Sequence, residues 1–237
     1  MSSLAIFLAL SAAVSWAITQ VLTKTGLQRM NLIAYASFRP LFALLFIVPY
    51  GIITSGLHLP GLKFILIAVS GGIFDTFFGS MLYFLAIKKS SAHESASLAN
   101  TAPFWGVVTA VLFLGEKPKP IVFISAFLVV SGAYFLVTRG KKTSSNHSFL
   151  DTLPALGAGA MWGIAETVPA KYCLNHGMSP VTYLFIMVAT AAITWNLVAI
   201  FSRKHSFHFR YPLRDIGVAM ITAFTGFFLG WILLLTG

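Results

Sequence analysis

The chain has 237 residues, of which 57% are hydrophobic and only 9% are charged. So few charged side chains exclude a soluble globular fold with an ordinary charged surface. The formal net charge of +10 would suit a nucleic-acid partner. However, the basic residues lie between long apolar segments and leave no continuous basic stripe for DNA or RNA.

Eight apolar segments fill almost the whole chain, and each has about the ~20 residues that a helix needs to cross a bilayer. Backbone groups in lipid must be hydrogen-bonded within the protein, and the segments lack the alternating pattern of a β-barrel. We therefore predict an all-α, polytopic membrane helix bundle with about eight spans. The expected spans are 4–24, 32–53, 62–87, 92–114, 120–138, 153–173, 180–201 and 213–236.

The first span has no basic residue before Lys24, so we interpret it as a retained helix rather than a signal peptide. One of its faces carries a polar row with four-residue spacing: Ser11, Ser15, Thr19 and Thr23. Residues four apart share a helix face, so this row should face other helices or a wet cavity. Close packing through small residues is equally supported. Trp16 and Gln20, in the adjacent row, are not small and favour a substrate-binding cavity.

In the second span, Arg39 directly precedes Pro40. A proline has no backbone N–H and disfavours helical geometry at the residue before it, so we expect Pro40 to break the helix and free the Ala36 carbonyl. A guanidinium beside a broken helix can hold a carboxylate through two parallel hydrogen bonds. Arg39 is therefore a candidate for binding the acidic end of a substrate.

Asp75, in the third span, is the acidic residue deepest within an apolar segment. Burial away from water would favour its protonated form, so Asp75 is a candidate for exchanging a proton and coupling transport to a proton gradient. A structural ion pair with Arg39 is an equally supported alternative. The two interpretations are compatible, because an ion pair that forms and breaks can act as a gate.

In the fourth span, Pro103 should break the helix and free the Ala99 carbonyl beside Asn100. Broken helices at bilayer depth are where transporters build binding sites, so Asn100 is a candidate substrate-binding residue. A simple hydrogen bond from Asn100 to a neighbouring helix explains its presence equally well.

The sixth span carries Trp162, Glu166 and Pro169. We expect Trp162 and Glu166 to be substrate-binding residues. A carboxylate inside a span is costly, by ~3 kcal/mol, and marks a functional site unless it lies near the interface. We expect Pro169 to break the helix and leave the Ala165 carbonyl beside Glu166, which suits a cation or a substrate amine. Glu166 is also a candidate for proton coupling. The alternative is a structural role near the interface, because Lys171 follows closely.

The chain contains a weak internal repeat. Trp16, Gln20 and Lys24 in the first span correspond to Trp162, Glu166 and Lys171 in the sixth. Such a pattern is typical of a duplicated transporter half, and chance similarity between apolar segments is the alternative. We predict a first repeat of five helices at 1–140 and an incomplete second repeat of three helices at 149–237. Five helices separate the copies, so the second copy should be inverted in the membrane.

Basic residues gather on one set of loops. Eleven of the 16 lie at the loops after the first, third, fifth and seventh spans: Lys24, Arg29, Lys88, Lys89, Arg139, Lys141, Lys142, Arg203, Lys204, Arg210 and Arg214. The opposite loops carry Lys63, Lys117, Lys119 and Lys171. This bias predicts that the basic loops are cytoplasmic and that both termini lie outside.

The segment 90–120, SSAHESASLANTAPFWGVVTAVLFLGEKPKP, has small residues, a mid-helix proline and a terminal Leu-Gly-Glu. It resembles the fourth-helix signature of EamA-type transporters in the drug/metabolite transporter superfamily. The first two spans, with Trp16 and Lys24 in the first and Arg39 in the second, also resemble the start of the family's sequences. The resemblance implies two five-helix inverted repeats, of which the last two helices are not found here, and termini in the cytoplasm. The predicted orientation is therefore left open.

The function favoured by these features is a secondary transporter in the cell (plasma or inner) membrane. It is expected to export small metabolites, amino acids or drugs by alternating access. Its partners would be a small organic solute and the lipid bilayer, with a homodimer or a completing subunit left open. The alternatives are a non-transporting, truncated or partner-dependent subunit and, less favoured, an intramembrane enzyme. The enzyme is less favoured because the six histidines fall in loops or at helix ends and no HExxH motif occurs. No cofactor or metal is predicted.

Overall fold

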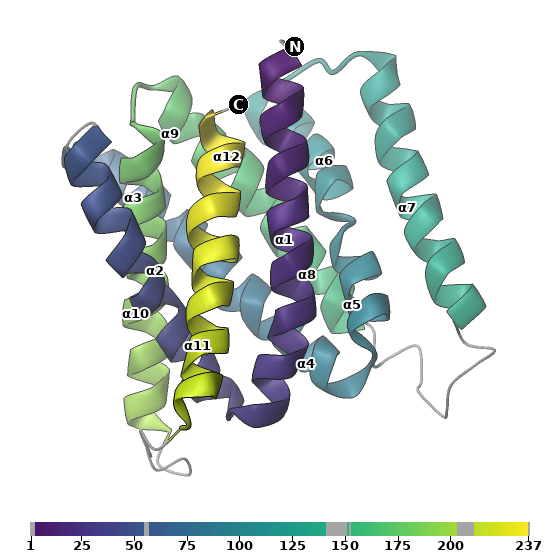
Figure 1. Cartoon of the computed structure of the whole chain (residues 1–237). Helices are drawn as coiled ribbons and strands as arrows, with labels where there is room; N and C mark the ends of the chain where they lie inside the picture. The colour runs from purple at the N-terminus through teal and green to yellow at the C-terminus, as the bar shows by residue number, and fades with distance from the viewer. Residues whose placement is uncertain (1–2, 55–56, 141–150, 152, 203–210, 237) are drawn as a thin grey trace. The chain divides into compact units, whose positions relative to one another are not determined.

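The computed structural model describes residues 3–54, 57–140, 151, 153–202 and 211–236, which form helices joined by short connectors (Figure 1). No β-strand occurs in this described part of the chain. The all-helical fold expected from the apolar segments is therefore confirmed. The helices belong to two compact units.

The first unit combines Met1–Gly72 with His176–Gly237. Its helices are α1 (Ser3–Arg29), α2 (Leu32–Thr54), α3 (Leu62–Gly72), α10 (Pro180–Phe201), α11 (Leu213–Thr222), the π-helix η4 (Ala223–Gly230) and α12 (Trp231–Thr236). Helix α10 packs on α2 and α3, while α1 packs along α11, η4 and α12. Figure 1 shows α1 beside this last helical run.

The core of this unit is aromatic and aliphatic. Tyr35, Ile47, Tyr183, Leu184 and Met187 are fully buried. Ser179 caps α10, because its side-chain oxygen accepts the Thr182 N–H at 3.2 Å and Pro180 occupies the first helical turn. The cap defines the start of α10, and the buried core packs α10 against α2.

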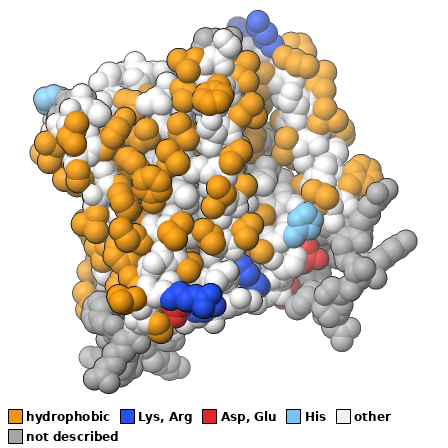
Figure 2. Space-filling model, in the orientation of Figure 1, with side chains coloured by type: hydrophobic (Ala, Val, Ile, Leu, Met, Phe, Trp, Pro, Cys, Tyr) orange, Lys and Arg blue, Asp and Glu red, His pale blue; other side chains and the backbone are white. Residues whose placement is uncertain are grey.

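The outward face of α1 is apolar. Leu4, Phe7, Leu10, Val14 and Val21 are each more than 60% exposed. Hydrophobic side chains run along the visible lengths of α1, α11 and α12 in Figure 2, as expected for helices that contact lipid.

The second unit covers Ile73–Asn175. It contains the π-helix η1 (Ile73–Gly79), α4 (Ser80–Lys89), α5 (Ala92–Ala99), α6 (Ala102–Leu114), α7 (Pro120–Gly140), α8 (Leu153–Ala165), the π-helix η3 (Glu166–Ala170) and α9 (Lys171–Asn175). Helix α8 is central, because it packs on η1, α4, α5 and α6. Helix α7 packs on α5 and α6.

Glycines let α8 approach its neighbours closely. A Cβ at Gly159 would lie 2.8 Å from the Ala99 carbonyl oxygen, and one at Gly163 would overlap the Ala102 carbonyl oxygen. Small residues at such contacts are the usual means by which membrane helices pack backbone to backbone.

Six helical runs in the described part of the chain are long and apolar enough to cross a membrane. They are Ser3–Arg29, Leu32–Thr54, Leu62–Lys89, Ala92–Leu114, Pro180–Phe201 and Leu213–Thr236. Of the eight expected spans, the fifth is apolar but shorter, at Pro120–Leu136. The sixth does not reach the same hydropathy, because it contains Glu166, Pro154, Pro169 and three glycines.

The two compact units do not follow the predicted repeats at 1–140 and 149–237, because each unit contains helices from both halves of the chain. The repeat boundaries therefore stay a prediction. So does the membrane orientation, because the basic residues at 141–142, 203–204 and 210 lie outside the described residues.

Candidate functional site

In the first unit, the polar row of α1 lies against the π-helix η4. The Ser15 hydroxyl donates to the Thr225 carbonyl at 2.7 Å, and the Thr19 and Thr225 hydroxyls are 2.6 Å apart. Ser15, Thr19 and Thr23 are buried. For these three residues the structure supports close helix packing rather than a wet cavity.

Trp16 also contacts η4, through its indole nitrogen. Its indole Nε1 donates to the Gly226 carbonyl at 3.0 Å, and its ring meets Trp231 edge to face, with centroids 6.1 Å apart. Gln20 lies half-buried one turn further along α1. Solute contacts by Trp16 and Gln20 stay a prediction.

Arg39 is a buried cation, with only 6% of its surface exposed. Its guanidinium carbon lies 4.6 Å from the centre of the Phe227 ring and 5.5 Å from that of Tyr35. Its Nη2 lies 3.5 Å from the Thr222 carbonyl oxygen. A desolvated cation over an aromatic face gains about 2 kcal/mol, so these rings hold Arg39 against η4.

Gly226 makes room for this arrangement. A Cβ at Gly226 would lie 3.1 Å from Nη2 of Arg39 and 2.8 Å from the Thr19 methyl carbon. The guanidinium therefore depends on a residue without a side chain in η4.

The predicted helix break at Pro40 is not found. Helix α2 runs without interruption from Leu32 to Thr54, with Pro40 and Pro49 inside it. A proline removes one N–H donor, and a membrane helix tolerates this where packing and neighbouring groups satisfy the backbone. Pro40 is fully buried, so the packing holds α2 helical here. Arg39 therefore projects from a continuous helix.

In the second unit, Asp75 is 5% exposed and lies in η1. Its backbone carbonyl accepts a hydrogen bond from Nε1 of Trp162 at 3.2 Å. The Trp162 ring also contacts Tyr83, with centroids 5.1 Å apart. The ion pair proposed between Asp75 and Arg39 would join the two units and stays a prediction.

The fourth span is interrupted at Asn100 and Thr101. Helix α5 ends at Ala99, α6 starts at Ala102, and Pro103 lies in the first turn of α6. The Thr101 hydroxyl donates to the Leu98 carbonyl at 2.7 Å, which satisfies one group at the break. Asn100 is exposed at this junction.

Glu166 opens the π-helix η3, which contains Pro169. Proline cannot donate its backbone N–H, and the wider π turn accommodates it without ending the helix. The Glu166 side chain is partly buried, and no described residue forms a hydrogen bond or an ion pair with its carboxylate.

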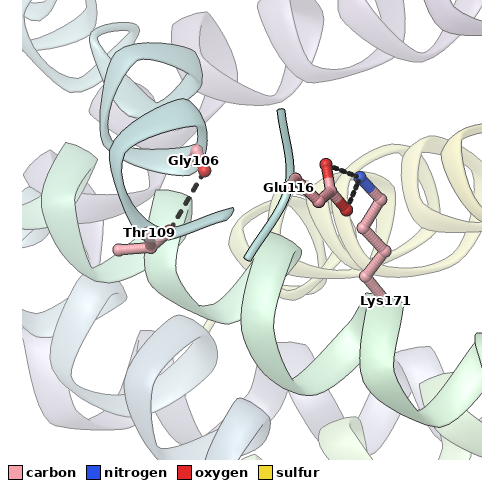
Figure 3. A network of polar contacts seen from close by, with 4 residues as sticks. All are labelled: Gly106, Thr109, Glu116 and Lys171. Carbon is pink, nitrogen blue, oxygen red and sulfur yellow. Dashed lines mark hydrogen bonds and ion pairs between the residues drawn. The ribbon is translucent and has the colours of Figure 1, made fainter. Parts of the chain in front are cut away.

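Lys171 does not neutralise Glu166. It pairs instead with Glu116, at the end of α6, with its Nζ 2.6 Å from Oε1 and 2.9 Å from Oε2 (Figure 3). In the same view the Thr109 hydroxyl donates to the Gly106 carbonyl at 3.1 Å. The Glu166 carboxyl is therefore not engaged by Lys171 and stays a candidate for contacting a solute.

Sequence reasoning missed the π-helices and the glycines beside the two tryptophans. A Cβ at Gly79 would lie 2.6 Å from Cδ1 and Nε1 of Trp162, and one at Gly230 would overlap Trp16. The available signal was the pair of Phe-Phe motifs that precede Gly79 and Gly230. In the described part of the chain, no group of three or more His, Cys, Asp or Glu side chains could hold a metal ion.

Residues 3–138 match the sequence profile of the EamA-like transporter family. The chain belongs to the EamA-like transporter family. This confirms the resemblance found in the sequence, and it makes the chain a multi-pass membrane protein of a transporter family rather than an enzyme family.

The chain is also similar to one curated protein in sequence and to one solved structure in fold. A protein of Archaeoglobus fulgidus named "Uncharacterized transporter" is 24% identical over 162 residues, which are 68% of this chain and 57% of that protein. The chain thus matches little more than half the length of this relative. A solved crystal structure shares the fold with a TM-score of 0.64 at 17% identity, over 99% of this chain and 84% of that one.

Proposed function

We propose that this chain is a secondary transporter that exports a small organic solute across the cell membrane. Access would alternate between two inverted repeats, at 1–140 and 149–237, with about eight spans divided five plus three. The observation that carries the proposal is that Arg39 and Asp75, which carry opposite charges, are both buried within apolar spans.

The energetic cost of these groups supports a functional role. Placing Asp or Arg at the centre of a span costs ~3 kcal/mol on insertion scales, and such residues usually mark substrate or proton pathways. Asp75 also lies in a π-helix and Arg39 lies against one. Single-turn π-helices occur frequently at functional sites.

The charges suggest which solute the protein carries. Arg39 suits a carboxylate, and Glu166 suits an amine because it has no ionic partner in the described chain. Gln20 and Asn100 would add neutral hydrogen bonds. Amino acids carry both a carboxylate and an amine and are therefore the first solutes to test, and Asp75 would exchange the proton that drives their export.

The two repeats would contribute different groups. The sequence has Met187 where the second repeat would place a counterpart of Arg39. An asymmetric site of this kind binds a solute with one acidic end in a single orientation, so the acidic and basic ends are not interchangeable.

Reconstituted protein tests the proposal. Proteoliposomes preloaded with single amino acids should show counterflow of the transported solute, and Asp75→Asn should abolish it. Asp151→Asn removes a carboxylate outside the expected spans and should leave counterflow intact. If folded wild-type protein shows no counterflow with any candidate solute, the transporter proposal fails and a partner-dependent subunit becomes the better explanation.

A further inference from the structure

The two compact units contain the same contact between a tryptophan and a π-helix. In the first unit, the indole of Trp16 donates to the Gly226 carbonyl at 3.0 Å. In the second unit, the indole of Trp162 donates to the Asp75 carbonyl at 3.2 Å. Both acceptors lie inside a π-helix, η4 or η1.

The match extends to the residue four positions after each acceptor. Gly230 follows Gly226 by four residues and lies against Trp16, and Gly79 follows Asp75 by four residues and lies against Trp162. Any side chain at either glycine would meet the indole ring. Each contact therefore consists of a backbone acceptor, a glycine that admits the ring, and an indole that spans both.

The acceptor position lies at the buried charged residue of each unit, Asp75 or Arg39. In η1 it is Asp75 itself. In η4 it is Gly226, over which Nη2 of Arg39 lies, 3.1 Å from where a Cβ would be. In the second unit, the hydrogen bond from Trp162 fixes the backbone from which the Asp75 carboxylate projects. In the first unit, the hydrogen bond from Trp16 fixes the Gly226 backbone, against which the Arg39 guanidinium lies.

We propose that Trp162 and Trp16 are positioning residues, which hold the π-helical turns that orient Asp75 and Arg39. The inference rests on the proposed function only for the roles of these two charged groups. The contact itself holds whatever the solute is. Both indole N–H groups donate to the protein backbone, so neither is proposed to bind the solute.

Simple ring packing is the competing explanation. Trp162 contacts Tyr83, and Trp16 contacts Trp231 at 6.1 Å. Phenylalanine would keep an aromatic ring at either place and lose the N–H donor. Trp105 is the matched control, because its Nε1 is buried with no hydrogen-bond partner among the described residues. Trp105→Phe therefore removes an indole N–H that holds no π-helix.

Backbone hydrogen–deuterium exchange in nanodiscs measures the effect without a solute. Losing one hydrogen bond should speed exchange of the amides that it protects about fivefold. Trp162→Phe should do this in peptides that cover 73–79, and Trp16→Phe in peptides that cover 223–230. Each should leave the other π-helix unchanged, and Trp105→Phe should change neither. Unchanged exchange in both π-helices would overturn the proposal, as would equal acceleration in all three variants.

A second readout follows the carboxylate. Dicyclohexylcarbodiimide labels carboxyl groups in apolar surroundings, and mass spectrometry locates the product. Trp162→Phe should raise the labelling rate of Asp75 at least threefold, because a loosened η1 exposes the carboxyl, whereas Trp16→Phe should not. An unchanged rate would show that Trp162 does not position Asp75.

A variant with a ring of the same size controls for structural disruption by the smaller phenylalanine. Benzothienylalanine at position 162 replaces the indole N–H by sulfur and keeps the size of the ring. It should reproduce the exchange and labelling changes of Trp162→Phe, and wild-type behaviour would overturn the proposal. If counterflow fails while these changes appear, the proposed function is refuted and the positioning role stands.

Discussion

Gly79→Ala should destabilise the protein although alanine is the better helix former. The added Cβ would lie 2.6 Å from Cδ1 and Nε1 of Trp162 and 3.1 Å from the Phe74 carbonyl oxygen. The indole cannot retreat freely, because its N–H is bonded to Asp75 and its other side contacts Tyr83. Overpacking of this kind costs about 1–3 kcal/mol.

Two further terms complete the estimate. Displacing the indole loses a hydrogen bond of about 1 kcal/mol, and alanine regains about 1 kcal/mol of helix propensity. The net loss is about 2 kcal/mol, which corresponds to a fall in Tm of about 4–8 °C for a chain of this size. Thermal unfolding in detergent, followed by intrinsic fluorescence, measures it directly.

Gly132→Ala is the control, because a Cβ there meets nothing within 4 Å. It should leave Tm unchanged or raise it slightly, since it gains helix propensity without a clash. If Gly79→Ala and Gly132→Ala unfold at the same temperature, the close fit between η1 and Trp162 is refuted.

Lys171→Met should lower Tm by less than about 3 °C, because its pair with Glu116 is partly exposed and such pairs contribute less than about 1 kcal/mol. A larger fall would mean that the pair is a structural clamp. Arg39→Lys should reduce transport of carboxylate-bearing solutes at least tenfold in proteoliposome uptake, because an ammonium cannot reproduce the planar contact with Phe227 or a bidentate bond. Equal uptake by both proteins would remove Arg39 from solute binding. Glu166→Gln should raise the KM for amine-bearing solutes about tenfold and leave Tm unchanged, because no ion pair in the described chain is lost. An unchanged KM would exclude Glu166 from the site.

The helical spans could be predicted because hydropathy is a local property. An apolar run of the required length becomes a helix whatever its neighbours are, since lipid offers its backbone no other partner. The span with Glu166 and Pro169 was found by the same reasoning, although its hydropathy is lower than that of the others. The sequence does not reveal where such a helix widens into a π turn, because that depends on tertiary contacts.

The two prolines Pro40 and Pro103 show this limit. Both lie inside apolar spans and both predict a break, yet only the helix around Pro103 is interrupted. Asn100 and Thr101, just before Pro103, form the turn between α5 and α6, whereas Pro40 is fully buried within α2. The outcome at Pro40 was decided by tertiary packing, which a local sequence pattern does not contain.

The tryptophans show the same limit at the candidate site. Trp16 and Trp162 were predicted to contact solute because they stand in apolar spans beside polar residues. Their indole N–H groups donate to the backbone of η4 and η1, and contact between their rings and a solute stays a prediction. The repeat in the sequence identified them as equivalent, and only the structure identifies what they bind.

Proton movement during solute flux tests the central claim most directly. Proteoliposomes that contain a pH-sensitive dye should change their internal pH when a transported solute is added to the wild-type protein. They should not do so with Asp75→Asn, while Asp151→Asn behaves as wild type. Solute-driven pH changes that persist in Asp75→Asn would contradict the role assigned to this buried carboxylate.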